Sequence, residues 1–132
     1  MVQKKIINTS KAPKAIGPYS QGIVSNGHIF LSGQIPLDKN GKLHDGTILE
    51  QVELNFENIG HLLATQNCNF QNIIKLTVFL RDIADFDAVN SKMIELLEEP
   101  YPARSLIQAA ALPKNVDIEF EVIAGLNDNG ER

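Results

Sequence analysis

Residues 101–124 read YPARSLIQAAALPKNVDIEFEVIA and combine an apolar run with a strictly alternating strand. Arg104 stands at the start of the apolar run, just after two prolines. In the second half, apolar side chains point one way and the acids the other, because successive strand side chains alternate between faces. The acids are Asp117, Glu119 and Glu121. We therefore expect two strands, close enough to be neighbours, that present a cation and a row of carboxylates. Such an arrangement suits the binding of a small anion beside a group that handles a proton.

The rest of the chain shows further strand and helix signals. Asn26-Gly27 is a strong hairpin turn between two β-rich runs. Thr47 and Glu50 form a capping box that starts a helix, Asp85 is a candidate cap for a second helix, and the prolines at 100 and 102 end it. The expected strands are Lys4–Asn8, Gly22–Ser25, His28–Ser32, Ile73–Leu80, Arg104–Ala111 and Val116–Gly125, and the expected helices run from Thr47 to about Gln66 and from Asp85 onward.

This order, β-β-β-α-β-α-β-β, predicts an α+β fold with a six-stranded sheet. Two helices cannot cover both faces of such a sheet, so we expect them on one face. The other face then meets solvent or another subunit. Apolar side chains left over on both sides of 106–112 favour a homo-oligomer, and the alternative is a monomer with a partly apolar open face.

Length and composition indicate one compact domain over residues 1–132, with about 127–132 as a short tail. The net charge of −4 argues against nucleic-acid binding. Cys68 is the single cysteine, so no internal disulfide is expected. The N-terminal residues do not resemble a signal peptide, and no segment is long and apolar enough to span a membrane, so we expect a cytoplasmic protein without membrane contact. The three histidines lack ligand spacing, so no metal site is expected.

Arg104 has two interpretations. Most arginines are solvated, and this one could simply begin a strand. The functional alternative is a guanidinium fork that binds a carboxylate through two parallel hydrogen bonds. The row of acids is likewise either the wet face of a strand or, beside such a cation, a source of one general base. The sequence does not fix which acid is nearest.

Two loop segments are weaker candidates. Tyr19 lies in a loop stiffened by Pro18, where it could cover a pocket or merely pack its ring on the core. Ser32 and Gly33 could offer a hydroxyl and a backbone N–H to a ligand, or form an ordinary strand end.

Seven segments together resemble the RidA/YjgF reactive-intermediate deaminase family. They are Ile16–Gly22 (IGPYSQG), Ser32–Pro36 (SGQIP), Lys75–Leu80 (KLTVFL), Asp85–Asn90 (DFDAVN), Pro102–Ser105 (PARS), Leu112–Lys114 (LPK) and Ile118–Ala124 (IEFEVIA). Each motif is short, but they occur in order over nearly the whole chain, which makes the resemblance specific.

The resemblance implies a chorismate-mutase-like fold, a homotrimer with sites between subunits, and no metal or organic cofactor. It implies hydrolysis of 2-imino and enamine acids, such as 2-iminobutanoate and 2-iminopropanoate, to 2-oxo acids and ammonia. By position, Arg104 matches the carboxylate-binding arginine and Glu119 the acid associated with the attacking water. Tyr19, Ser32, Gly33 and Asn90 match residues of the substrate pocket.

The sequence departs from the family pattern at two places that bear on substrate preference. Leu106 occupies a position where the family often has cysteine, and the turn from the second helix to Arg104 is shorter than in many relatives. The physiological substrate stays open. The alternative function is a binding protein that senses 2-oxo acids or amino-acid metabolites in the same cleft without turnover. A ribonuclease, claimed for some relatives, fits the acidic charge poorly.

Overall fold

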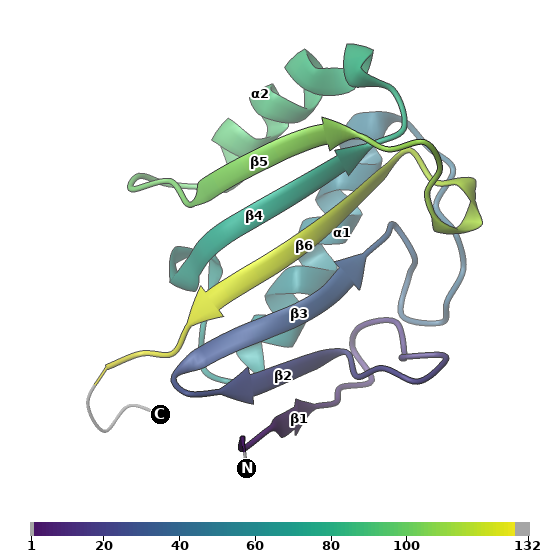
Figure 1. The fold of residues 1–132 in the computed structure, drawn as a ribbon. Coiled ribbons are helices and arrows are strands. Elements are labelled where there is room, and N and C mark those ends of the chain that lie inside the picture. Colours follow the sequence, from purple (N-terminus) through teal and green to yellow (C-terminus); the bar gives the residue numbers. More distant parts are fainter. Residues whose placement is uncertain (1, 129–132) are drawn as a thin grey trace.

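The computed structural model describes residues 2–128, which form one six-stranded sheet with two α-helices (Figure 1). The strands are β1 (Lys5–Ile7), β2 (Gly22–Ser25), β3 (His28–Gln34), β4 (Ile73–Leu80), β5 (Ala103–Gln108) and β6 (Ile118–Gly125). The helices are α1 (Ile48–Ala64) and α2 (Phe86–Leu96), with short 3-10 turns at Phe70–Asn72, Ile83–Asp85 and Pro113–Asn115.

The sheet is mixed, with strand order β1-β2-β3-β6-β4-β5. All neighbouring strands are antiparallel except β4 and β5, which run parallel on either side of the α2 crossover. Figure 1 shows both helices on the same face of the sheet, and the other face has no helix over it. The predicted α+β class, the order of elements and the one-sided placement of the helices are confirmed.

Local signals in the sequence explain where these elements begin and turn. Asn26 and Gly27 adopt φ values of 51° and 80°, the left-handed pair that a tight hairpin between β2 and β3 requires. Thr47 caps α1, since its hydroxyl accepts a hydrogen bond from the Glu50 N–H at 3.2 Å while the Glu50 carboxylate accepts from the Thr47 N–H at 2.8 Å. Both predictions are confirmed.

The core lies between the helices and the covered face of the sheet. Phe56 of α1 packs edge-to-face against Phe120 of β6 and against Phe70, with ring centroids 5.0 and 5.4 Å apart. Alternate residues of β4 and β6 point into this core and are fully buried. They include Leu76, Val78, Leu80, Ile118, Phe120 and Ala124.

Several predicted boundaries were wrong in detail. β5 ends at Gln108 rather than Ala111, and β6 begins at Ile118 rather than Val116, whose backbone N–H donates to the Pro113 carbonyl of the 3-10 turn at Pro113–Asn115. Asp85 makes no capping hydrogen bond; Asp82 caps the 3-10 turn before α2, where its carboxylate accepts from the Ala84 N–H at 2.9 Å. The expectation that the Arg104 strand and the carboxylate strand are neighbours was also wrong, because β4 lies between β5 and β6.

The open face of the sheet carries a row of apolar side chains across four strands. Strand pairing places Ile6 beside Ile23, Ile23 beside Phe30, and Phe30 beside Ile123. Ile6 is 64% exposed and Phe30 is 44% exposed. A contiguous apolar patch of this kind is typical of an interface.

The tail expected at about 127–132 falls largely on residues 129–132, which lie outside the described residues. Within residues 2–128, no helix is long and apolar enough to cross a membrane.

Candidate functional site

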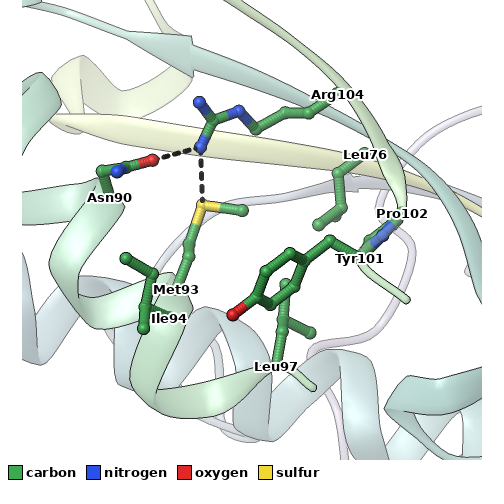
Figure 2. A pocket seen from close by; sticks show the side chains of 8 residues that line it. All are labelled: Leu76, Asn90, Met93, Ile94, Leu97, Tyr101, Pro102 and Arg104. Atoms are coloured by element: carbon green, nitrogen blue, oxygen red, sulfur yellow. Dashed lines mark hydrogen bonds between the residues drawn. The ribbon is translucent and has the colours of Figure 1, made fainter. Parts of the chain in front are cut away.

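Arg104 projects from the edge strand β5 toward α2. It pairs with Leu76 of β4, whose side chain is buried beneath the helices, so Arg104 lies on the helix-covered face. Its Nη1 donates to Asn90 Oδ1 at 2.7 Å and lies 3.9 Å from Met93 Sδ (Figure 2). Its guanidinium carbon is also 5.6 Å from the centre of the Phe86 ring. Three residues on one face of α2 thus hold the cation.

A cavity of about 410 Å³ lies beside Arg104, between α2 and the segment that enters β5. Arg104 is the single charged residue among those that line it, and Asn90 and Tyr101 are polar. The remaining walls are Leu76, Met93, Ile94, Leu97 and Pro102. This part of the molecule therefore offers one anion-binding group in apolar surroundings, which is a common composition for a small-molecule site.

Glu119 lies in a second cavity, of about 690 Å³, that also brings Tyr19, Ser32 and Gly33 together. The Ser32 hydroxyl donates to the Ser20 carbonyl at 2.6 Å, and the Tyr19 hydroxyl accepts from the Ile16 N–H at 3.2 Å. These hydrogen bonds tie the Tyr19 loop to the end of β3 and fix the shape of this cavity.

Gly33 and Glu119 approach each other so closely that a larger residue at position 33 would displace the Glu119 carboxylate. A Cβ atom placed on Gly33 would overlap the Glu119 carboxylate oxygen Oε2. Burial raises the pKa of the Glu119 carboxyl above its ordinary value, and the negative charge of Glu121, two residues along the same face, raises it further. A half-buried carboxyl with a raised pKa is suited to accepting a proton near neutral pH.

The two groups of candidate residues do not meet within one protomer. Glu119 pairs with Phe79, whose side chain alternates away from those of the buried β4 residues, so Glu119 lies on the open face and Arg104 on the covered face. The structure therefore brings Arg104 together with Asn90, and Glu119 together with Tyr19, Ser32 and Gly33, in two separate half-sites.

Some residues of the half-sites escaped the sequence reasoning. Lys14 and Lys114 line the Glu119 cavity, and Lys114 has a left-handed backbone (φ 54°), which nothing in its sequence context signals. Phe86 is 36% exposed, and its ring lies against the Arg104 guanidinium. Positions 86, 90 and 93 are spaced four and three residues apart, and this spacing was the available signal that their side chains share the face of α2 that contacts Arg104. Leu106 packs against the core and lines neither half-site cavity.

The chemistry available here belongs to acids, bases and anion binding. Among residues 2–128, no three His, Cys, Asp or Glu side chains gather into a group that could hold a metal ion. The guanidinium fork of Arg104 is of a kind that can bind a carboxylate, and the carboxyl group of Glu119 is of a kind that can accept a proton.

Known proteins are similar to this chain over nearly its whole length. Residues 9–126 match the family model described as endoribonuclease L-PSP. The chain is 43% identical over 122 residues to the 2-iminobutanoate/2-iminopropanoate deaminase of Capra hircus, covering 92% of this chain and 89% of that protein.

Two further relatives differ in what their names say. A protein of Lactococcus lactis that is named as a regulator, AldR, is 46% identical over 121 residues, covering 91% of this chain and 96% of that protein. The crystal structure of Escherichia coli TdcF with bound serine superposes with a TM-score of 0.86 at 39% identity, covering 94% of this chain and all (100%) of that one.

Proposed function

Because this chain belongs to the RidA/YjgF family, we propose that it is a hydrolase that deaminates 2-imino acids and their enamine tautomers to 2-oxo acids and ammonia. 2-Iminobutanoate and 2-iminopropanoate are the first substrates to test, because relatives of this chain are named as deaminases of these two compounds. The observation that supports this most directly is the presence of both required groups, Arg104 and Glu119, each in its own cavity.

The proposed active site is formed between two subunits of a homotrimer. Arg104 and Asn90 of one protomer would face the half-site of Glu119 in its neighbour, because one protomer cannot supply both. The apolar row on the open face of the sheet supports this assembly, since association would remove it from water. We place the protein in the cytoplasm.

In the proposed mechanism, Arg104 binds the substrate carboxylate in two parallel hydrogen bonds and thereby fixes the imine carbon beside Glu119. Glu119 accepts a proton from a water molecule while the water oxygen forms a bond to the imine carbon, and Glu119 then gives that proton to the former imine nitrogen. The hydroxyl proton of the resulting amino alcohol passes through Glu119 to the same nitrogen, and ammonia leaves as the carbon–nitrogen bond breaks and the carbonyl forms, so that Glu119 ends ionised again. Tyr19, Ser32 and Gly33 would shape the cavity around the water and the reacting carbon.

The direct test measures release of 2-oxobutanoate from freshly generated 2-iminobutanoate with and without the protein. We expect a clear acceleration that Arg104→Ala removes. Lys42→Ala is the matched control, because it deletes an exposed cation that lines neither half-site cavity. An Arg104→Ala protein that keeps the wild-type rate would exclude the proposed role of Arg104.

The alternative is a binding protein that senses 2-oxo acids in the same cleft; one relative is named as a regulator, but the deaminase names of the other relatives favour the enzyme. Saturable binding of 2-oxobutanoate without any acceleration of imine hydrolysis would support this alternative over the enzyme. The family description also names a ribonuclease, but the net charge of −4 is unfavourable for RNA binding. Failure to retain RNA at any salt concentration would exclude the ribonuclease.

A further inference from the structure

We propose that Gln34 is a positioning residue for Glu119: its side-chain amide fixes a β-bulge in β3, and this bulge holds Gly33 against the Glu119 carboxyl. The inference rests on the proposed deaminase function and adds to it a residue that acts through Glu119.

Strand β3 contains one extra residue beside β6. The register shifts between Leu31 and Gln34, where two residues of β3, Ser32 and Gly33, stand opposite the single residue Glu121 of β6. Leu31 and Gln34 both pair with buried residues of β6 and are themselves only 4% and 8% exposed, so both lie on the helix-covered face. Ser32 and Gly33 are therefore both left for the open face, although neighbours in a regular strand alternate between faces. The bulge thus explains how two consecutive residues line one cavity.

Hydrogen bonds to all three polar groups of Ser32 fix the bulge. The Ser32 N–H donates to the Gln21 carbonyl at 3.0 Å, and its hydroxyl donates to the Ser20 carbonyl at 2.6 Å. Its carbonyl accepts from Gln34 Nε2 at 2.9 Å. The first two bonds join the bulge to the segment that leads into β2, and the third closes it within β3. Removal of the Gln34 donor would leave a part-buried carbonyl without this partner, which is costly and favours relaxation of the bulge.

The bulge determines the surroundings of the Glu119 carboxyl through Gly33. The carboxyl lies directly against Gly33, since a Cβ placed there would overlap Oε2. Within residues 2–128 no group donates a hydrogen bond to this carboxyl, so packing determines where it lies. Contact with Gly33 also removes water from one side of the carboxyl and contributes to the burial that raises its pKa. A relaxed bulge would admit water there, and the pKa would fall.

The other titratable groups at this cavity do not depend on Gln34. Glu121 lies on β6, Lys14 and Tyr19 lie on the segment before β2, and Lys114 lies on the 3-10 turn before β6. The proposed trimer adds an arginine of the neighbouring protomer. Replacement of the Gln34 amide by an uncharged side chain alters none of these groups, so a shift in the pKa of the catalytic carboxyl would report the bulge.

Gln34→Met is the variant that tests this role, because methionine has a similar length and no N–H donor. Gln51→Met is the matched control. Gln51 is 3% exposed, donates to the Gly46 carbonyl at 3.0 Å and to Asp117 Oδ2 at 2.9 Å, and does not line the second cavity. Each variant thus removes a buried amide donor, and both should unfold at a lower temperature than the wild type.

Two measurements separate positioning from general destabilisation. One is the pH dependence of kcat/KM for 2-iminobutanoate, and the other is the NMR titration of the Glu119 carboxyl carbon, assigned with Glu119→Gln. In Gln34→Met we expect the acidic limb and the NMR midpoint to move to lower pH by about half a unit or more, and kcat to fall about fivefold. In Gln51→Met the limb and the midpoint should stay in place.

An unchanged NMR midpoint in Gln34→Met, or the same shift in both variants, would overturn the inference. If Gln34→Met does not fold, the wild type decides: the side-chain N–H protons of Gln34 should exchange with water about tenfold or more slowly than those of the exposed Gln3. Equal exchange rates would overturn the inference too. Failure of the proposed function looks different, since the protein would then accelerate no imine while the NMR midpoint still moved in Gln34→Met.

Discussion

Arg104 and Glu119 lie on opposite faces of one sheet and on strands separated by β4. A carboxylate bound to Arg104 therefore has no access to Glu119 of the same protomer. If both residues act on one substrate, each active site must take its arginine from one subunit and its glutamate from the next.

Subunit mixing tests this shared site. Arg104→Ala and Glu119→Gln should each be inactive alone, but co-assembled equal amounts should recover about a quarter of the wild-type activity, because in a ring with head-to-tail sites about one site in four receives both intact residues. The measurement is the rate of 2-oxobutanoate release after joint refolding. Mixing Arg104→Ala with a protein that carries both substitutions is the control and should restore nothing. Full activity in a verified monomer would contradict the shared site.

Gly33→Ala should impair catalysis while leaving the fold intact. The added methyl group would overlap Glu119 Oε2, so the flexible carboxylate would move away from the position in which we propose that it accepts a proton from water. We expect kcat to fall about tenfold or more, since misplaced catalytic groups lose much of their effect. Gly60→Ala in α1 serves as control, because a Cβ there would make an ordinary 3.5 Å contact with Phe70, so activity should stay unchanged. If Gly33→Ala were as active as Gly60→Ala, catalysis would not depend on the position of the Glu119 carboxylate.

The pH profile should report the environment of Glu119. In the proposed mechanism the ionised carboxylate is the active form, so kcat/KM should fall as pH drops through a pKa that burial and Glu121 raise above the ordinary value. Glu121→Gln removes the neighbouring charge, and the acidic limb should therefore move to lower pH. Glu57→Gln, on the exposed side of α1, should leave the limb in place. A limb that moves to higher pH in Glu121→Gln would contradict this assignment.

Glu119 should also reduce stability at neutral pH. Its pKa is higher in the folded chain than in the unfolded chain, so its contribution is most favourable below the unfolded pKa and is lost as pH rises through the folded pKa. Glu119→Gln should therefore unfold at a higher temperature than the wild type at pH 7, and the gain should disappear at acidic pH. Thermal unfolding across this pH range measures it. A variant that is less stable at pH 7 would mean that the ionised carboxylate is stabilised in the assembly.

Asn90 should act by positioning Arg104. Asn90→Leu removes the oxygen that accepts from Arg104 Nη1 at 2.7 Å, so the guanidinium gains freedom and substrate binding weakens. We expect KM to rise about three- to tenfold with kcat little changed, in line with roughly 1 kcal/mol for such a hydrogen bond. Asn90→Asp should raise KM further, because its carboxylate competes for Arg104. Ser91→Ala, at an exposed neighbouring position, is the control. A change confined to kcat would contradict the positioning role.

Most of the fold was predictable because its signals are local. The Asn26-Gly27 turn, the Thr47–Glu50 capping box and the alternation of β6 each depend on residues close together in the chain, and each is present in the structure. The prediction that Asp85 caps the second helix was wrong, because Asp82, three residues earlier, accepts the hydrogen bond from the Ala84 backbone N–H instead. The strand ends around 109–117 were less predictable from the sequence, since the turn at Pro113–Asn115 depends on left-handed backbone at Lys114, a residue type that rarely adopts it.

By itself, the sequence determined the α+β class, the family and the identity of the residues that match its motifs. The relation between those residues was decided only by the tertiary structure. Strand order is set by long-range pairing, which inserts β4 between β5 and β6, and the alternation of side chains then places Arg104 and Glu119 on opposite faces. Because chain order does not encode this pairing, residues that looked adjacent form two half-sites.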